Sequence, residues 1–303
     1  IMRRGETVFS GCWGQRDREN NKPMTEDTIF RIYSMTKPIV STALMLLFEE
    51  GRFRLIDPVA KYLPAFGATK VLLPDGKLVD QTSPMLVHQL LSHTSGLTYD
   101  FLVDYPSGEL YRDARVMNDA TRTLEQCIDV LAGIPLAFQP GSKWCYSVGI
   151  DVAARLVEVI SGQPLGQFLK ERMFDPLGMS DTGFGVPAAK LDRLAAMYGH
   201  PDLVALDQTI LKIFSPPTMG SNERREVADT YPTDKPDVFV RGGHGLYSTL
   251  GDYSKFAQML CNGGELNGAR VVGRKTLELM HSNWIPSALL PYDIGGMPSP
   301  GWG

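Results

Sequence analysis

The chain has few cysteines for its length. Four cysteines occur in 303 residues, and none forms a Cys-x-x-Cys pair or a Cys/His ligand spacing. This scarcity argues against a zinc-stabilised module, and sparse cysteines in a chain of this size are typical of buried free thiols. We therefore expect free thiols at all four positions, which are Cys12, Cys127, Cys145 and Cys261.

Long hydrophobic runs are also missing. The longest apolar stretch, near Ile39 to Phe48, spans about ten residues, whereas a membrane helix needs about twenty. No signal-peptide pattern is visible, so we expect no membrane partner and a cytoplasmic location.

Excess charge of either sign is absent. The formal net charge is -4, and no block of like charges interrupts the chain. This pattern does not favour nucleic acid or a polybasic membrane surface as a partner, which leaves small molecules.

Several common catalytic motifs do not occur. There is no G-x-S-x-G, no P-loop, no G-x-G-x-x-G and no H-E-x-x-H. The five histidines do not pair at metal-binding intervals on one predicted helix; they are His88, His93, His200, His244 and His281. We therefore expect no metal and no cofactor.

One motif remains, S-x-x-K at Ser34 and Lys37. From Ser34 to Glu50 the sequence predicts a helix that Gly51 ends, with Pro38 tolerated in its first turn. Beyond that turn the helix is mostly apolar, which predicts a place in the core.

The spacing of the motif has a chemical reason. Residues three apart lie on one helical face, so the Lys37 amine can reach the Ser34 hydroxyl. A helix N-terminus favours negative charge on a nucleophilic oxygen, and an apolar setting favours the neutral amine that a base requires.

The rest of the chain is predicted to be largely helical in its middle, with one strand near the start at Thr7–Trp13. Long loops are expected at Thr98–Thr121 and Phe214–Asp237. Further helices are expected at Pro84–Leu91, Leu124–Leu131, Ile150–Ile160, Leu165–Met173, Leu250–Cys261 and Gly273–His281.

At this point the sequence resembles a known family. The segments that carry the likeness are Ser34-Met35-Thr36-Lys37-Pro38, Leu55-Ile56-Asp57-Pro58-Val59, Tyr62-Leu63-Pro64, Leu90 to Leu97, Pro140-Gly141 leading to Tyr146-Ser147, and Gly242 to Thr249. Their order and spacing resemble the β-lactamase-related serine hydrolases over nearly the whole chain. Within that group the chain looks closest to the family VIII carboxylesterases, with class C β-lactamases and DD-peptidases as relatives.

The resemblance implies roles for individual positions. Ser34 would be the nucleophile, and Lys37 the base that activates it. Tyr146 would match the tyrosine of the second family motif and share proton transfer to the leaving group. The backbone N–H of Ser34 would form half of an oxyanion hole. Apart from the resemblance, the glycines around His244 allow close backbone approach near the cleft, so His244 and Gly243 are candidates for substrate binding.

Two departures from the family pattern bear on function. Val148 stands where β-lactamases and penicillin-binding proteins carry Asn. The loss of that amide removes a polar contact for a substrate amide and favours simple esters. The third family motif, Lys-Thr-Gly or Trp-Gly-Gly, would lie on a strand beyond Gly303, since Lys275-Thr276-Leu277 falls in a predicted helix.

The resemblance also implies the fold, which is α/β in the broad α+β sense. We expect an antiparallel sheet flanked by helices, plus a mostly helical region over roughly residues 60–240. Residues 1–303 would form a single catalytic unit that lacks the first strand of the family and its C-terminal strands and helix.

Structural roles compete with the catalytic ones. Ser34 could be a helix N-cap, Lys37 a solvated lysine and Tyr146 a core aromatic; the matched context favours catalysis for all three. For His93 a structural role in its loop is the better interpretation. For His244 a substrate-lining role and a structural role are equally well supported. Three further expectations carry no chemistry: Thr249 with Ser248 and Asp252 marks a helix start, and Trp144 and Cys145 serve packing.

The sequence therefore predicts a serine carboxylesterase that hydrolyses short-chain esters through an acyl-enzyme on Ser34. Three alternatives use the same residues: a β-lactamase, a peptidase for D-amino-acid substrates and an acyltransferase. A fourth, of another class, is a non-catalytic relative that keeps the fold for binding.

Overall fold

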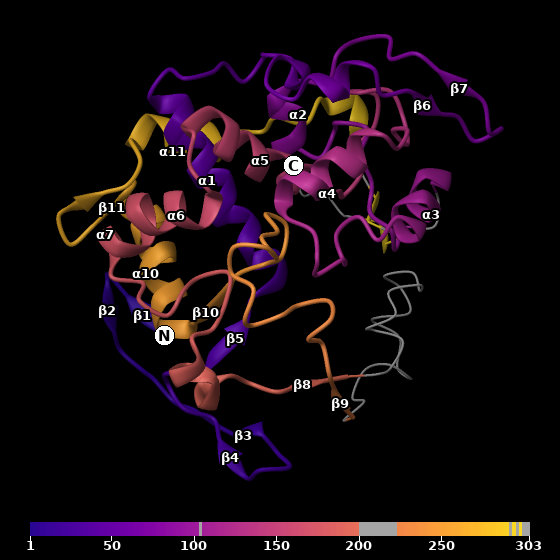
Figure 1. Cartoon of the computed structure of the whole chain (residues 1–303). Coiled ribbons are helices and arrows are strands. Elements are labelled where there is room, and N and C mark those ends of the chain that lie inside the picture. Colours follow the sequence, from indigo (N-terminus) through magenta and orange to yellow (C-terminus); the bar gives the residue numbers. More distant parts are fainter. Residues whose placement is uncertain (103–104, 200–222, 291–292, 295–296, 299–303) are drawn as a thin grey trace.

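The structure is a computed structural model, and it describes residues 1–102, 105–199, 223–290, 293–294 and 297–298. Figure 1 shows a group of helices above a small sheet, with short strand pairs at the edges. The predicted class, an antiparallel sheet flanked by helices with a mostly helical region, is confirmed.

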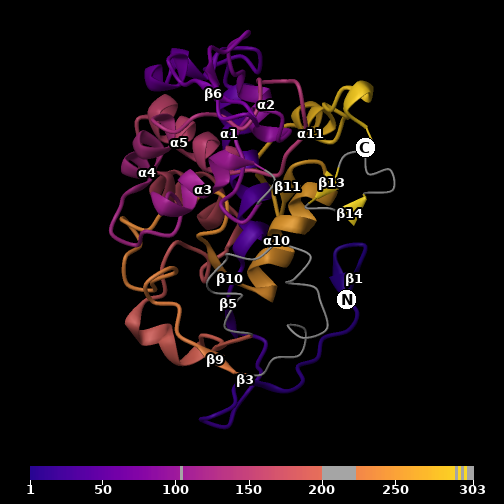
Figure 2. The same ribbon diagram turned by 90° about the vertical axis from the view of Figure 1, so that its right-hand side faces the viewer.

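A buried helix, α1 (Thr36–Glu49), lies at the centre of this arrangement. Ile39, Leu44 and Leu47 on it are at most 1% exposed, as its apolar sequence predicts. The helix packs mainly on α5 (Gly149–Ser161). Around α5 lie α2 (Val87–Leu91), α4 (Leu124–Ala132) and α6 (Leu165–Leu169), and Figure 2 shows α2 and α4 beside α5 again from a second side.

The sheet that bears on the site joins the two halves of the chain. Strand β5 (Ile29–Arg31) pairs antiparallel with β10 (Tyr247–Thr249), and Phe30 faces Ser248. Single bridges extend the sheet on both sides, from Ile29 to Leu194 and from Tyr247 to Gly183. Because β5 leads into α1 and β10 leads into α10 (Leu250–Cys261), this pairing sets where α1 begins.

The other strands form short antiparallel pairs at the periphery. They are β1 (Met2–Arg3) with β2 (Glu6–Thr7), β3 (Gln15–Asp17) with β4 (Lys22–Pro23), β6 (Val71–Leu72) with β7 (Leu78–Val79), β8 (Met197–Tyr198) with β9 (Arg224–Arg225), β11 (Glu265–Leu266) with β12 (Ala269–Arg270), and β13 (Asp293–Ile294) with β14 (Met297–Pro298). Further α-helices in the described part of the chain are α3 (Pro106–Asp113), α7 (Asp175–Leu177) and α11 (Arg274–Met280).

Most predicted helices are confirmed with shifted ends. The helix expected at Pro84–Leu91 begins only at Val87, because Leu86 is extended and bridges to Pro58. The helix expected at Leu165–Met173 is α6 followed by a π-helical turn, Lys170–Phe174. The expected start at Thr249 is also confirmed, since its side chain accepts the Asp252 backbone N–H at 3.1 Å.

Two other expectations are wrong. No strand covers Thr7–Trp13 beyond Thr7: Val8, Phe9 and Trp13 are 51–73% exposed and form no strand ladder among the described residues. Alternating β-formers make a strand only where a partner supplies hydrogen bonds. The loop expected at Thr98–Thr121 contains α3, with Pro106 at its first turn.

Two expectations concern segments that are only partly described or only partly correct. In the loop expected at Phe214–Asp237, residues 214–222 lie outside the described residues, and the rest contains β9.

The expectation for the cysteines is partly correct. Cys127 and Cys145 are buried and in no disulfide, as expected, whereas Cys12 and Cys261 are exposed, so the expected burial is wrong for these two. Among the helices that the structure describes, none is long and apolar enough to cross a bilayer.

Candidate active site

Ser34 lies at a sharp turn between β5 and α1. It is the middle residue of a 3-10 turn, Tyr33–Met35, and its side chain is exposed. Tyr33 has φ of 44°, a left-handed conformation that costs an aromatic residue of order 1–3 kcal/mol. The Tyr33 ring packs edge-on against Tyr231 at 5.1 Å. The fold therefore holds a strained residue directly before the serine.

Two side chains converge on the Ser34 hydroxyl. Lys37 Nζ lies 3.1 Å from Ser34 Oγ, and the Tyr146 hydroxyl lies 2.9 Å from the same atom. Lys37 is 8% exposed, so it is not a solvated lysine. The side chain of Ser34 does not cap α1, whose N-cap is Met35. The structure thus brings the three sequence-predicted residues together within hydrogen-bond reach.

The amine of Lys37 is held on three sides. It donates a hydrogen bond to the Gly243 carbonyl oxygen at 2.8 Å. It also lies 4.7 Å from the ring centre of Tyr146 and 5.4 Å from that of Tyr99, distances at which a cation interacts with an aromatic face. These contacts fix the amine next to Ser34.

Tyr146 comes from the loop before α5, and His93 supports that loop. The Ser147 backbone N–H donates to His93 Nδ1 at 3.2 Å, and the His93 ring lies 4.9 Å from the Tyr146 ring. Burial, with a smaller effect of the Lys37 charge, lowers the pKa of His93 to about 3. The His93 ring must be neutral for Nδ1 to accept this hydrogen bond, because both ring nitrogens of a protonated histidine are donors. The Trp144 ring also packs edge-on against His93, with ring centres 6.0 Å apart.

A cavity of about 220 Å³ opens at Ser34. Its surface is mainly apolar, and Tyr146 and His244 also line it. Burial, then the charges of Lys37 and Arg241, lowers the pKa of His244 to about 3. Gly243, also predicted to bind substrate, is not among the lining residues, and its carbonyl accepts the hydrogen bond from Lys37. The other lining residues include Tyr33, Tyr99, Asp100, Phe101, Met117, Asn118, Met197, Arg225, Val227 and Tyr231.

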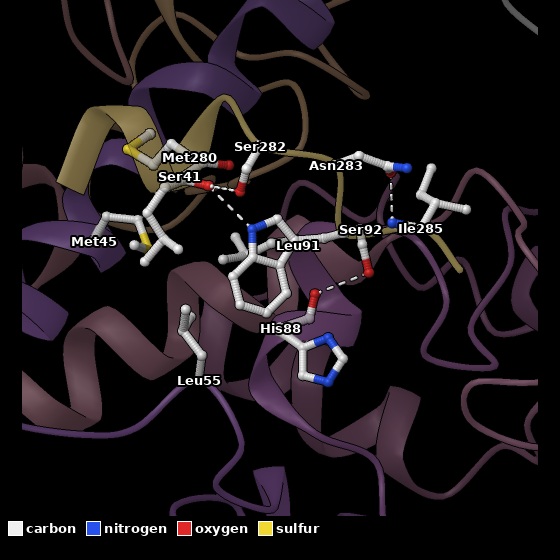
Figure 3. Close-up of a pocket in the computed structure, with 12 residues that line it drawn as sticks. Ser41, Met45, Leu55, His88, Leu91, Ser92, Met280, Ser282, Asn283 and Ile285 are labelled. Carbon is white, nitrogen blue, oxygen red and sulfur yellow. Dashed lines mark hydrogen bonds between the residues drawn. The ribbon is translucent and has the colours of Figure 1, made fainter. Parts of the chain in front are cut away.

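A larger cavity, of about 430 Å³, lies elsewhere. Figure 3 shows its wall, formed by side chains of α1, α2 and α11 such as Ser41, His88 and Met280. It contains none of Ser34, Lys37 and Tyr146. Size alone therefore does not locate the chemistry, and the smaller cavity is the candidate site.

Sequence reasoning missed two residues beside this site. Asp151, in the first turn of α5, is 0% exposed and accepts the Gly243 backbone N–H at 2.9 Å. Tyr99 packs against Tyr146 at 5.2 Å. The only sequence signal for Asp151 was its place in an otherwise apolar helix segment, before Val152, Ala153 and Ala154. An acidic residue in such a segment indicates a buried carboxylate with a hydrogen-bond partner.

The described residues contain no cluster of three or more His, Cys, Asp or Glu side chains that could hold a metal ion. His200 lies outside the described residues. Val148, which replaces the family's Asn, is 1% exposed in the core and does not line the Ser34 cavity.

A serine, a buried amine and a phenol in this arrangement, on this fold, define the class of β-lactamase-related serine hydrolases. The sequence comparison agrees with that class. The chain belongs to the Beta-lactamase family, whose sequence pattern matches residues 1–293.

Two relatives match most of the chain, and one of them is a named esterase. The chain is 34% identical over 289 residues to an uncharacterized protein of Mycobacterium tuberculosis, with 94% of this chain and 67% of the relative covered. It is 35% identical over 259 residues to Esterase EstB of Burkholderia gladioli, with 83% and 62% covered.

A solved structure gives the same result. EstCE1, described as a hydrolase with promiscuous acyltransferase activity, superposes with a TM-score of 0.71 at 29% identity, covering 92% of this chain and 69% of that one. The chain thus spans between 62% and 69% of the length of these three relatives.

Proposed function

We propose that this protein is a serine carboxylesterase that hydrolyses short-chain esters through an acyl-enzyme on Ser34. The observation that carries the proposal is the position of Ser34 Oγ, within 3.1 Å of both Lys37 Nζ and the Tyr146 hydroxyl. The small and mainly apolar cavity at Ser34 supports a substrate with a short acyl group. The esterase relative EstB supports the reaction type.

The reaction proceeds in two acyl transfers. Ser34 Oγ forms a bond to the ester carbonyl carbon while its proton passes to Lys37 or Tyr146. The bond to the alcohol oxygen then breaks, and the alcohol leaves with that proton. Water attacks the acyl carbon and gives its proton to the same groups. The bond from that carbon to Ser34 Oγ then breaks, the proton returns to Oγ, and the acid is released. The Ser34 backbone N–H would donate to the oxyanion, and such a donor is worth about 3 kcal/mol.

Acyl transfer to an alcohol is the second candidate. It needs the same acyl-enzyme with an alcohol in place of water, and EstCE1 is described as having that side activity. Adding an alcohol during p-nitrophenyl butyrate turnover would yield a new ester if this candidate holds. A chromogenic cephalosporin tests the β-lactamase alternative in the same format, and D-alanyl peptides test the peptidase alternative.

The test of the main proposal is active-site labelling with a fluorophosphonate probe, with p-nitrophenyl butyrate turnover measured in parallel. Wild type should be labelled at Ser34, and Ser34→Ala should lose both labelling and turnover. Ser41→Ala is the matched control, since Ser41 lies on α1, the helix that follows Ser34, but lines the other cavity.

Labelling that persists in Ser34→Ala would contradict the proposal. Absence of labelling in a folded wild type would favour the non-catalytic alternative, a protein that keeps the fold for binding. A cytoplasmic location is a separate prediction, which fractionation of expressing cells would test.

A further inference from the structure

The loop that precedes β10 is attached to the Ser34 turn at several points. The Ile32 N–H donates to the Leu246 carbonyl at 3.0 Å, and the Leu246 N–H donates to Thr36 Oγ1 at 3.1 Å. Lys37 Nζ donates to the Gly243 carbonyl at 2.8 Å. The position of the Lys37 amine therefore depends on where this loop, residues 241–246, is held.

Arg241 anchors one end of the loop. Its guanidinium is fully buried and donates to four backbone carbonyls, at 2.8 to 3.1 Å. Three of these carbonyls belong to the segment around residues 117–122, and the fourth is that of Val240. This anchor lies two residues before Gly243 and leaves the Gly243 peptide itself to another partner.

That partner is Asp151. Its Oδ1 accepts the Gly243 N–H at 2.9 Å, while the carbonyl of the same residue accepts the hydrogen bond from Lys37. A carboxylate in the first turn of α5 also lies at the favourable end of the helix dipole. Burial raises the pKa of Asp151, while its bond to Gly243 and the Lys37 and Arg241 charges act in the opposite direction.

The loop approaches α5 so closely that there is no room for a side chain at Gly242 or Gly243. A Cβ on Gly243 would stand 2.6 Å from Asp151 Oδ2 and 3.0 Å from the Tyr99 hydroxyl. A Cβ on Gly242 would stand 2.5 Å from both the Ile150 carbonyl oxygen and the Ala154 methyl. The two glycines are therefore required for the contact between Asp151 and the loop.

We propose that Asp151 is a positioning residue for acyl transfer: its carboxylate fixes Gly243 through the backbone N–H, and the carbonyl of the same residue holds the Lys37 amine at Ser34. The inference rests on the proposed function of Ser34. Asp151 itself does not line the Ser34 cavity, so it acts only through Gly243 and Lys37. The hydrogen bond from Gly243 to Asp151 matters because a small displacement of the Lys37 amine would be costly to the rate.

The test compares Asp151→Ala and Asp151→Asn with wild type. Asp151→Ala should lower kcat for p-nitrophenyl butyrate by roughly 100-fold and change KM little, because the amine is displaced but the cavity wall is intact. Asp151→Asn keeps an oxygen that accepts the Gly243 N–H, so it should recover to within about 10-fold of wild-type kcat. The rate of fluorophosphonate labelling at Ser34 should follow the same order.

Asp252→Asn is the matched control. Asp252 is also a buried carboxylate in the first turn of a helix and also accepts a backbone N–H, from Asp181 at 2.7 Å. Its kcat should equal that of wild type even if the melting temperature falls. A purely structural role for Asp151 would instead lower the melting temperature and leave kcat of the folded fraction unchanged.

Gly243→Ala reaches the same contact from the other side, in case Asp151→Ala does not fold. The added methyl must displace Asp151 or the peptide, so kcat should fall with KM retained. Full activity of a folded Asp151→Ala or Gly243→Ala would overturn the positioning role while leaving the proposed function intact. Absence of Ser34 labelling in wild type would overturn both.

Discussion

The hydroxyl of Tyr146 lies 2.9 Å from Oγ of Ser34, although 112 residues separate the two in the chain. Ser34 is placed by the turn from β5 into α1, and Tyr146 by the loop before α5. The packing of α1 on α5 brings the two together. The phenol is therefore in a position to pass a proton to a leaving group bound at Ser34.

We expect Tyr146→Phe to lose this proton transfer while keeping the ring. The ring contacts to Tyr99 and Lys37 remain, so KM should change little. The expected loss in kcat is about 10²- to 10³-fold for an alkyl ester, whose alkoxide needs a proton to leave. For a p-nitrophenyl ester the loss should be smaller, because p-nitrophenolate leaves without one. Equal losses for both esters would contradict the assignment.

Because of His93, the free energy of unfolding should decrease at acid pH. Its pKa in the folded state is lowered to about 3 from the usual 6.5, chiefly by burial, so the neutral ring is the form that folding favours. The stabilisation is fully present above pH 6.5 and is lost as the pH falls from 6.5 toward 3. Urea denaturation at pH 7 and pH 5 checks this, with His93→Gln as the comparison. The variant should lose less stability between the two pH values than wild type.

Val148→Asn should not create a β-lactamase. Val148 is 1% exposed in the core and does not line the Ser34 cavity, so an amide there would be buried away from substrate. An unsatisfied buried amide costs about 1–3 kcal/mol of the free energy of unfolding. We expect a lower urea midpoint and no hydrolysis of a chromogenic cephalosporin. A gain of cephalosporin turnover would show that the side chain at 148 reaches the substrate.

Leu44→Ala tests whether α1 is the centre of the core. Leu44 is 0% exposed, so truncation should lower the free energy of unfolding by about 2–5 kcal/mol. Leu250→Ala serves as the control, because Leu250 is 70% exposed, and it should change stability by less than about 0.5 kcal/mol. Urea denaturation of both variants measures the difference. Similar midpoints for the two variants would contradict the central position of α1.

Predictions from local sequence were reliable where the interactions that form the structure lie within one segment of the chain. The S-x-x-K spacing places Ser34 and Lys37 on one side of a helix start, and the apolar residues after Pro38 predict the burial of α1. The helix at Leu250–Cys261 has the predicted ends, because Thr249 caps it locally. The strand expected over Thr7–Trp13 failed for the converse reason, since a strand depends on a partner that its own sequence does not contain.

The sequence by itself determined the nucleophile candidate, its lysine and the buried helix that carries them, because residues three apart on a helix are neighbours whatever the rest of the chain does. Only the tertiary structure decided that Tyr146 reaches Ser34, that Asp151 holds Gly243, and that His93 supports the Tyr146 loop. Each of these contacts joins segments more than 50 residues apart. They exist because α5 packs against α1 and the glycines at 242–243 let the loop approach α5.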